Sequence, residues 1–163
     1  MTDVAASFAT PRIAAGALFA DGERLMLVRK TYGNGWDIPG GYAEAGESPA
    51  AACQRELKEE LSLDREPEQL LVVDWAPHPE EGDKILYVFT CGALGSDEAH
   101  IRLGDGELDR WEWVPVSRLS DYVMPRLARR LAHAYEALAD GIPVYLEHGE
   151  PSLHPQRARH LPA

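Results

Sequence analysis

The sequence predicts a single α/β domain with a mixed β-sheet, and three observations support this. The chain has 163 residues, which suits one domain and suffices to bury about 70% of the surface that the unfolded chain exposes. Strand-like apolar runs outnumber helical patterns, which occur once in the middle of the chain and once near its end. Because strands and helices do not alternate regularly, we do not expect a doubly wound parallel sheet.

The expected elements follow from periodicity and turn residues. We expect strands at residues 13–19, 25–28, 70–75, 85–91, 111–116 and 144–146, and helices at 48–61 and 127–138. Asp21 and Gly22 separate the first two apolar runs, which indicates a hairpin. Adjacent glycines at 40 and 41 indicate unusual backbone dihedrals or a ligand that approaches the backbone closely.

The central helix has a recognisable start and a regular apolar face. Ser48 is a good N-cap and Pro49 a good first helical residue. Cys53, Leu57 and Leu61 recur every four residues, so we expect them to form the buried stripe of this helix.

The second half of the chain reads as strands followed by one helix. Turn-like residues 77–83 separate two strands, and Asp140-Gly141 ends the late helix. Residues 144–146 are expected to form a short edge strand. We therefore place one domain at residues 1–148 and a loose C-terminal tail at 149–163.

Composition limits the classes of function. The chain is 45% hydrophobic and 26% charged, with a formal net charge of −11 and a pI near 4.9. This acidity argues against broad binding to nucleic-acid polymers, which requires basic patches. No apolar run approaches the ~20 residues that span a bilayer, and the N-terminus does not resemble a secretory signal. We expect a cytoplasmic protein without a membrane partner, in which Cys53 and Cys91 are buried free thiols.

Four carboxylates gather around the start and end of the central helix. Glu56, Glu59 and Glu60 stand at i, i+3 and i+4 and share one helical face, and Glu47 lies in the loop before the helix. A solvated acidic face is the commoner reason for such a pattern. Here each like-charge pair costs roughly 0.2–0.5 kcal/mol, and the helix dipole disfavours anions near the C-terminal end. A divalent cation with oxygen ligands would reverse the sign of the interaction.

The segment from Gly41 to Leu63 reads GYAEAGESPAAACQRELKEELSL and resembles the Nudix box. That pattern is Gly-x5-Glu-x7-Arg-Glu-U-x-Glu-Glu-x-Gly-U, where U is aliphatic. Every position matches except the second glycine, which is Ser62 in this chain. Glycine there commonly permits a left-handed helix exit, and serine would pay about 1 kcal/mol for the same conformation. Residues 36–41 and 111–119 are similar to the family's segments before and after the box.

The resemblance implies an α/β/α sandwich with a mixed β-sheet and a loop-helix-loop catalytic motif. It implies Mg²⁺ or Mn²⁺ as the cofactor, held by Glu56, Glu59, Glu60 and the backbone carbonyl of Gly40. Arg55 would orient Glu56, and Gly41 and Glu47 would support the loop. A carboxylate, from a set that includes Glu56 and Glu59, would deprotonate the attacking water.

Some members of the family add a glutamate from the loop before the late strand. By this resemblance Glu107 is the best candidate for that catalytic role and Glu98 the second. The alternative is that Glu107 is an ordinary charged residue of a loop, without a catalytic role.

The resemblance implies hydrolysis of a phosphoanhydride bond in a nucleoside diphosphate linked to another group, such as ADP-ribose or a nucleotide sugar. Pro77 and Pro79 straddle the position of a proline that marks many ADP-ribose hydrolases, which is a weak hint. A nucleoside triphosphate pyrophosphohydrolase of the house-cleaning type is the main alternative, and a catalytically silent nucleotide sensor is the second. The partner is a small nucleotide, and a homodimer is left open.

Residues that bind the rest of the substrate are not identified from the sequence. Basic residues on the late helix are expected to form a solvated face, with phosphate contact as the alternative; they are Arg126, Arg129 and Arg130. Aromatic residues that could stack on a base are Trp36, Trp75 and Tyr87, and we expect core packing for at least two of them.

Overall fold

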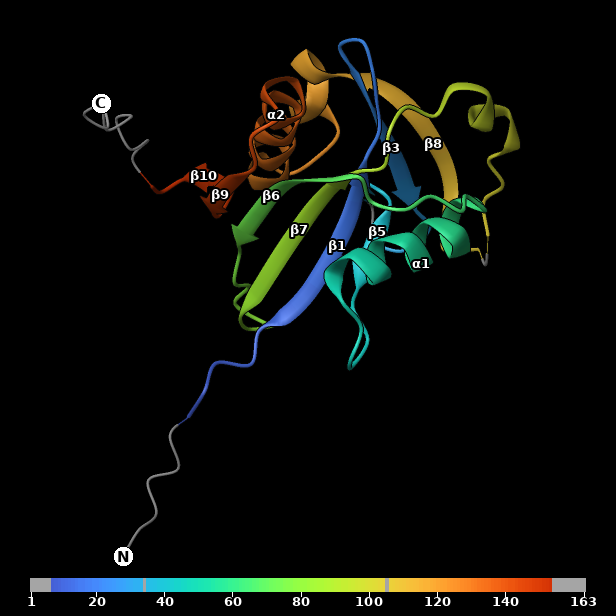
Figure 1. Ribbon diagram of the computed structural model, residues 1–163. Coiled ribbons are helices and arrows are strands. Elements are labelled where there is room, and N and C mark those ends of the chain that lie inside the picture. The colour runs from blue at the N-terminus through green and yellow to red at the C-terminus, as the bar shows by residue number, and fades with distance from the viewer. Residues whose placement is uncertain (1–6, 34, 105, 154–163) are drawn as a thin grey trace, which may run out of the picture.

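The protein folds into two β-sheets and two main helices (Figure 1). The computed structural model describes residues 7–33, 35–104 and 106–153. The six-stranded sheet has the order β10-β9-β6-β7-β1-β5, with β1 Arg12–Leu18, β5 Gly40–Tyr42, β6 Gln69–Trp75, β7 Lys84–Thr90, β9 Val144–Glu147 and β10 Glu150–Pro151. The smaller sheet contains β2 Ala20–Asp21, β3 Arg24–Lys30, β4 Trp36–Asp37 and β8 Leu108–Pro115. The helices are α1 Pro49–Leu61 and α2 Pro125–Asp140, with short 3₁₀ turns η1 Gly95–His100 and η2 Val116–Asp121.

The larger sheet is mixed, as expected. β1 pairs with β7 and β6 pairs with β9 in parallel, whereas the remaining neighbours are antiparallel. The late strand predicted at the edge, β9, is paired on both sides, and β10 is the edge. The sequence prediction was wrong here because a turn with Gly149 at φ 79° lets the chain fold back after β9. The predicted tail therefore includes β10, and its residues 154–163 lie outside the described residues.

The first hairpin is smaller than predicted. The apolar run at residues 13–19 does not pair with the next run; β1 belongs to the large sheet, and only β2 pairs with β3 around the Asp21-Gly22 turn. The chain passes from one sheet to the other at Phe19, which is fully buried. Turn residues specify where the chain reverses, but they do not specify which sheet each arm joins.

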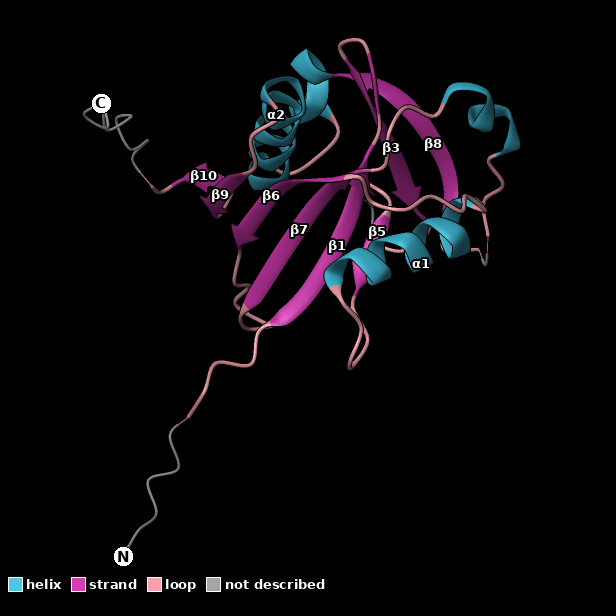
Figure 2. Ribbon diagram, in the orientation of Figure 1, coloured by secondary structure: helices cyan, strands magenta, loops and turns pink. Residues whose placement is uncertain are grey.

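The helices cover opposite faces of the large sheet, which produces the expected α/β/α layering (Figure 2). Along β1, Ala15 and Ala17 pack in one core with Cys53, Leu57 and Leu61 of α1. The side chain of Leu18, the residue after Ala17, belongs to the second core, with Leu131 and Ala134 of α2. This alternation is the period-2 pattern of a strand buried on both faces.

The ends of α1 follow the sequence prediction. The hydroxyl of Ser48 accepts a hydrogen bond from Ala51 N at 3.1 Å, and Pro49 is the first helical residue. Ser62 adopts the left-handed conformation, with φ 59° and ψ 29°, and Leu63 N donates to Leu57 O across the helix end. The Ser62 Oγ also donates to Arg102 O at 3.1 Å, a contact that a glycine could not make.

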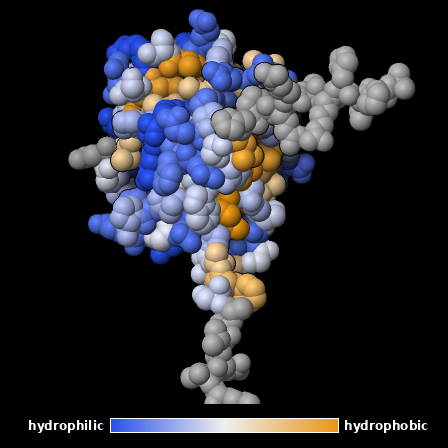
Figure 3. All heavy atoms as spheres, turned by 90° about the vertical axis from the view of Figure 1, so that its left-hand side faces the viewer, coloured by the Kyte–Doolittle hydropathy of each residue, from blue (hydrophilic) through white to orange (hydrophobic). Residues whose placement is uncertain are grey.

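The helices and the surface show no unusual apolar feature within the described residues. None of the helices within the described residues has the length and apolar character needed to cross a membrane. Hydrophilic residues cover most of the face in Figure 3, with hydrophobic residues in separate patches, which is ordinary for a protein surface. Cys53 and Cys91 are free and buried, as predicted.

Candidate active site

Arg55 joins three of the four carboxylates singled out in the sequence. Its Nε and Nη2 donate to the two oxygens of Glu47 at 2.8 and 3.0 Å. Its Nη1 donates to Glu56 at 3.0 Å and to Glu59 at 3.2 Å. A further bond from Nη2 to Tyr42 O at 3.0 Å fixes the guanidinium against β5. One arginine therefore offsets much of the repulsion among the carboxylates.

The fourth carboxylate, Glu60, lies apart from Arg55 and faces the glycine turn. Its Oε2 accepts a hydrogen bond from Gly40 N at 3.0 Å, and the residue is only 7% exposed. Burial is the main cause that raises the pKa of Glu60, to about 8, while the bond from Gly40 N opposes the rise. A buried carboxylate with a backbone donor as its only hydrogen-bond partner among the described residues is an unusual cost for the fold.

The pKa values of Glu56 and Glu47 are shifted in opposite directions. Burial raises the pKa of Glu56, against the effect of its bond to Arg55. The hydrogen bond from Arg55 lowers the pKa of Glu47, and that same pairing raises the pKa of Arg55. Glu47 and Arg55 thus form an ion pair that favours the charged form of both, whereas burial disfavours the charged form of Glu56.

Two glycines make room for the carboxylates. Gly40 has φ 151°, and a Cβ there would lie 2.2 Å from Ala15 O of the neighbouring strand. A Cβ on Gly41 would lie 2.3 Å from Glu56 Oε1. The unusual dihedral predicted from the sequence is present at Gly40, and the close approach that the structure shows is that of β1 and α1 to the turn.

The two candidate loop glutamates are placed differently. Glu107 is exposed, immediately precedes β8, and lies near enough to Glu56 to help raise its pKa. The Glu107 carbonyl accepts a hydrogen bond from Thr31 N at 2.8 Å, which fixes the backbone there. Glu98 instead accepts a bond from Trp113 Nε1 at 3.2 Å. Of the two, Glu107 is the one near the carboxylate cluster.

The donor chemistry fits a hard divalent cation. Glu56, Glu59, Glu60 and the Gly40 carbonyl offer oxygen only, which Mg²⁺ and Mn²⁺ prefer. In the described part of the chain no three acidic, histidine or cysteine side chains are arranged so that they could hold a metal ion. Arg55 binds Glu56 and Glu59, and Gly40 N binds Glu60. The buried, raised-pKa carboxylate of Glu60 is the group that a cation would stabilise most.

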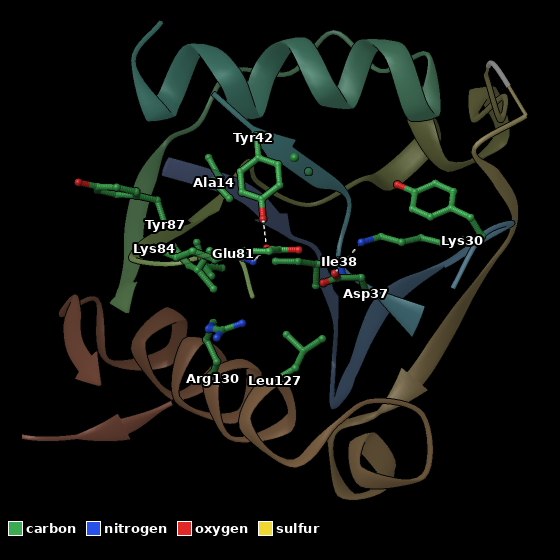
Figure 4. A pocket seen from close by; sticks show the side chains of 17 residues that line it. Ala14, Lys30, Asp37, Ile38, Tyr42, Glu81, Lys84, Tyr87, Leu127 and Arg130 are labelled. Atoms are coloured by element: carbon green, nitrogen blue, oxygen red, sulfur yellow. Dashed lines mark hydrogen bonds and ion pairs between the residues drawn. The ribbon is translucent and has the colours of Figure 1, made fainter. Parts of the chain in front are cut away.

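A cavity of about 390 Å³ adjoins this cluster on the α2 side of the sheet (Figure 4). Gly40 and Gly41 form part of its wall, so the turn separates the cavity from the carboxylates of α1. Apolar side chains line part of it, among them Ile38 and Leu127. Its polar side chains come from strands β3, β4, β5 and β7, from helix α2 and from two loops; they are Lys30, Tyr32, Asp37, Tyr42, Glu81, Lys84, Tyr87 and Arg130.

The sequence analysis missed this cavity, and one of its predictions there was wrong. Arg130 is not on a solvated face: it is 7% exposed, and its Nε donates to the buried Asp74 at 2.5 Å. Its neighbour Arg129 does reach the surface, where it pairs with Glu150 at 2.8 Å. Arg130 lies four residues before Ala134 and seven before Ala137, on the buried side of α2. This helical spacing is the one sequence feature that indicates its burial.

The aromatic residues have mixed roles. Trp36 packs edge-to-face on Tyr122, with ring centroids 5.4 Å apart, and contacts the α2-side core. Tyr87 packs against the α1-side core and also borders the cavity.

The sequence profile of the NUDIX domain matches residues 10–138. The chain belongs to the Nudix family. That match covers most of the chain, including the glycine turn, the carboxylates of α1 and most of α2. The membership of the Nudix family and the mixed α/β/α fold expected from the sequence are thereby confirmed.

Two Nudix relatives and one solved structure illustrate the likeness. The chain is 33% identical over 100 residues to the ADP-ribose pyrophosphatase of Mycobacterium tuberculosis (strain ATCC 25618 / H37Rv), covering 59% of this chain and 47% of the relative. It is 33% identical over 105 residues to the 8-oxo-dGDP phosphatase NUDT18 of Homo sapiens, covering 64% of this chain and 30% of that protein. The chain thus spans less than half the length of both. The MutT protein of Methanosarcina mazei Go1 shares the fold, with a TM-score of 0.64 at 22% identity, over 83% of this chain and 98% of that one.

Proposed function

We propose that this Nudix protein hydrolyses a phosphoanhydride bond in a nucleoside diphosphate linked to another group, such as ADP-ribose or a nucleotide sugar, with Mg²⁺ or Mn²⁺. The observation that carries the proposal is the carboxylate cluster itself. Three glutamates on one helical face lie beside a glycine turn, and one of them is buried with a raised pKa. The ionised form of such a buried group is unfavourable unless a cation offsets its charge.

Each residue of the cluster has a distinct task in this proposal. Glu56, Glu59 and Glu60 would hold the cation together with the Gly40 carbonyl. The cation would neutralise charge on the phosphoryl oxygens and on the departing phosphate. Arg55, anchored on Glu47 and Tyr42 O, fixes the direction in which Glu56 points.

Glu107 is our proposal for the carboxylate that receives the proton of the attacking water. It is exposed just before β8 and lies close enough to act electrostatically on Glu56, and Arg55 makes no hydrogen bond to it.

The substrate class has weaker support than the reaction. A relative named ADP-ribose pyrophosphatase favours a nucleoside diphosphate linked to a sugar. A relative named 8-oxo-dGDP phosphatase favours the alternative, a house-cleaning enzyme for damaged nucleotides. We rank the first higher because Pro77 and Pro79 flank the position that marks many ADP-ribose hydrolases.

The test is a panel of ADP-ribose, nucleotide sugars and nucleoside triphosphates, assayed in ¹⁸O-water with Mg²⁺, with Mn²⁺ and with EDTA. We expect ADP-ribose to give AMP and ribose phosphate, with ¹⁸O in one of the two. A simple phosphate monoester should survive, because the site would stabilise a departing phosphate better than an alkoxide. Undiminished turnover in EDTA, or nucleotide binding with no turnover on any substrate, would contradict the proposal, and the latter would favour a sensor.

A further inference from the structure

Basic side chains gather around one cavity in a protein that is strongly acidic overall. Lys30, Lys84 and Arg130 line the 390 Å³ cavity beside the Gly40–Gly41 turn, although the chain carries a net charge of −11. Two further cations, Arg12 and Arg126, lie close enough to act electrostatically on Lys84. Acidic side chains lie there too, because Asp37 and Glu81 also line the cavity and pair with Lys30 and Lys84. An anion must therefore bind through the donors that these carboxylates leave free or give up.

Arg130 is the most buried of these cations. Its side chain is 9% exposed, and Nε is bound to Asp74 at 2.5 Å. Among the described residues, no hydrogen-bond partner accepts from its two terminal nitrogens, and the side chain points from α2 into the cavity (Figure 4). These two nitrogens are paired donors whose geometry matches the oxygens of a phosphate or carboxylate.

Lys84 lies at the opposite wall of the cavity, at the start of β7. Its side chain is 14% exposed, and burial together with the positive charges of Arg126, Arg12, Arg130 and Lys30 lowers its pKa. An anion between Lys84 and Arg130 would relieve this crowding of like charges.

Lys84 already has an acidic partner, and that partner is exposed. Glu81, which is 40% exposed, forms an ion pair with Lys84 and accepts a hydrogen bond from Tyr42 Oη at 2.7 Å. The carboxylate of Glu81 can turn into water, where solvent screens its charge, whereas the ammonium group of Lys84 is mostly buried. A dianionic phosphate would therefore compete well against Glu81 for the ammonium group.

The cavity is a continuation of the proposed active site. Gly40 and Gly41 border it on one side and contact Glu60 and Glu56 on the other. A substrate whose diphosphate lies at the carboxylates would extend past this turn into the cavity.

We propose that this cavity is a subsite for a further phosphate group of the substrate, held by Arg130 and Lys84. The inference rests on the proposed function: within its substrate class, the subsite favours nucleoside diphosphate compounds that carry a phosphomonoester besides the diphosphate over those, such as ADP-ribose, that do not. Glu81 acts as the competing anion that an incoming phosphate displaces from Lys84.

The first experiment measures binding of inorganic phosphate alone by calorimetry, in EDTA, so that no cation at the carboxylates takes part. Wild-type protein should bind phosphate. Lys84→Met should weaken the affinity about tenfold or more, because a charge-assisted hydrogen bond is lost. Glu81→Gln should strengthen it roughly two- to fivefold, because the competing carboxylate is gone. Arg118→Gln removes an exposed cation of η2, paired with Asp121, and should behave as wild type.

The second experiment compares kcat/KM for ADP-ribose with that for its 2′-phosphate, and for dephospho-coenzyme A with that for coenzyme A. In at least one pair, the wild type should have a higher kcat/KM for the compound with the extra phosphate. In Lys84→Met the two compounds of that pair should have equal kcat/KM. Absence of phosphate binding, or equal losses for both members of each pair in Lys84→Met, would overturn the subsite. Phosphate binding that responds to the variants, combined with no hydrolysis of any diphosphate, would contradict the proposed function and leave the anion site standing.

Discussion

At the scale of single residues, Arg55 explains how a helix tolerates three crowded carboxylates. It donates to Glu47, Glu56 and Glu59 at once, so the repulsion expected at i, i+3 and i+4 spacing is largely offset. Glu60 has no such partner among the described residues and accepts only the Gly40 amide. The four carboxylates are therefore unequal, and their substitutions should have unequal effects.

Removing one carboxylate charge should separate catalysis from stability. We expect Glu59→Gln and Glu60→Gln each to lower kcat by orders of magnitude while leaving the circular dichroism spectrum unchanged, because cation binding needs the charge and the fold does not. Lys58→Gln, at an exposed position of the same helix, serves as the control and should retain turnover. Near-normal kcat in either glutamine variant would remove that residue from the proposed ligand set.

The pKa of Glu60 makes a second prediction, for stability against pH in EDTA. Its pKa is raised from 4.5 to about 8 in the folded protein, so between these values the folded state binds a proton that the unfolded state has released. Stability should therefore fall as the pH rises from about 5 to about 8, and stop falling above it. The Tm measured across this range should decline less in Glu60→Gln than in the wild type. If Tm declined equally with pH in the two proteins, Glu60 would not have the raised pKa on which this prediction depends.

At the scale of elements, the exit of α1 offers a test of backbone strain. Ser62 has φ 59°, which glycine adopts about 1 kcal/mol more easily, but its Oγ bonds to Arg102 O. Ser62→Ala keeps the strain and loses this bond, whereas Ser62→Gly loses both. We expect Ser62→Gly to be more stable than Ser62→Ala by about 1 kcal/mol in urea unfolding, with kcat unchanged in both. A large effect on kcat would assign Ser62 a role at the site.

The helices were predictable from the sequence because their signals are local. Ser48, Pro49 and the left-handed exit at Ser62 fix α1 within a few residues, and Gly141 ends α2. The division of the first apolar runs between two sheets was not predictable, because strand partners are chosen by contacts distant in sequence. The cavity was missed for the same reason: Lys30, Lys84 and Arg130 are separated by more than forty residues each and meet only in the folded protein.

At the scale of the whole molecule, the buried pair of Arg130 and Asp74 joins α2 to β6. Asp74 is fully buried and also accepts a hydrogen bond from Gly149 N at 3.2 Å, so it ties the β9–β10 turn to the same point. Arg130→Met should destabilise the protein by about 3 kcal/mol, because it leaves Asp74 charged and unpaired.

The double variant Asp74→Asn/Arg130→Met should recover part of that loss, because the buried charge is removed as well. Urea unfolding of the two single variants and the double variant gives the coupling energy. Additive effects would show that the two side chains do not depend on each other.

The alternation along β1 has a consequence for how the chain tolerates change in length. Ala15, Ala17 and Phe19 belong to one core and Leu18 to the other, and Gly16 pairs with Gly40 at the turn that borders the carboxylates. Deleting one residue within β1 would exchange the two sets of side chains and move the glycine pair out of register together. A single deletion there should thus be more harmful than any one substitution, whereas the exposed turn at residues 80–82 should accept a lost or added residue. In a scan of single-residue deletions, β1 would be a segment in which the number of residues is as strictly constrained as their side chains.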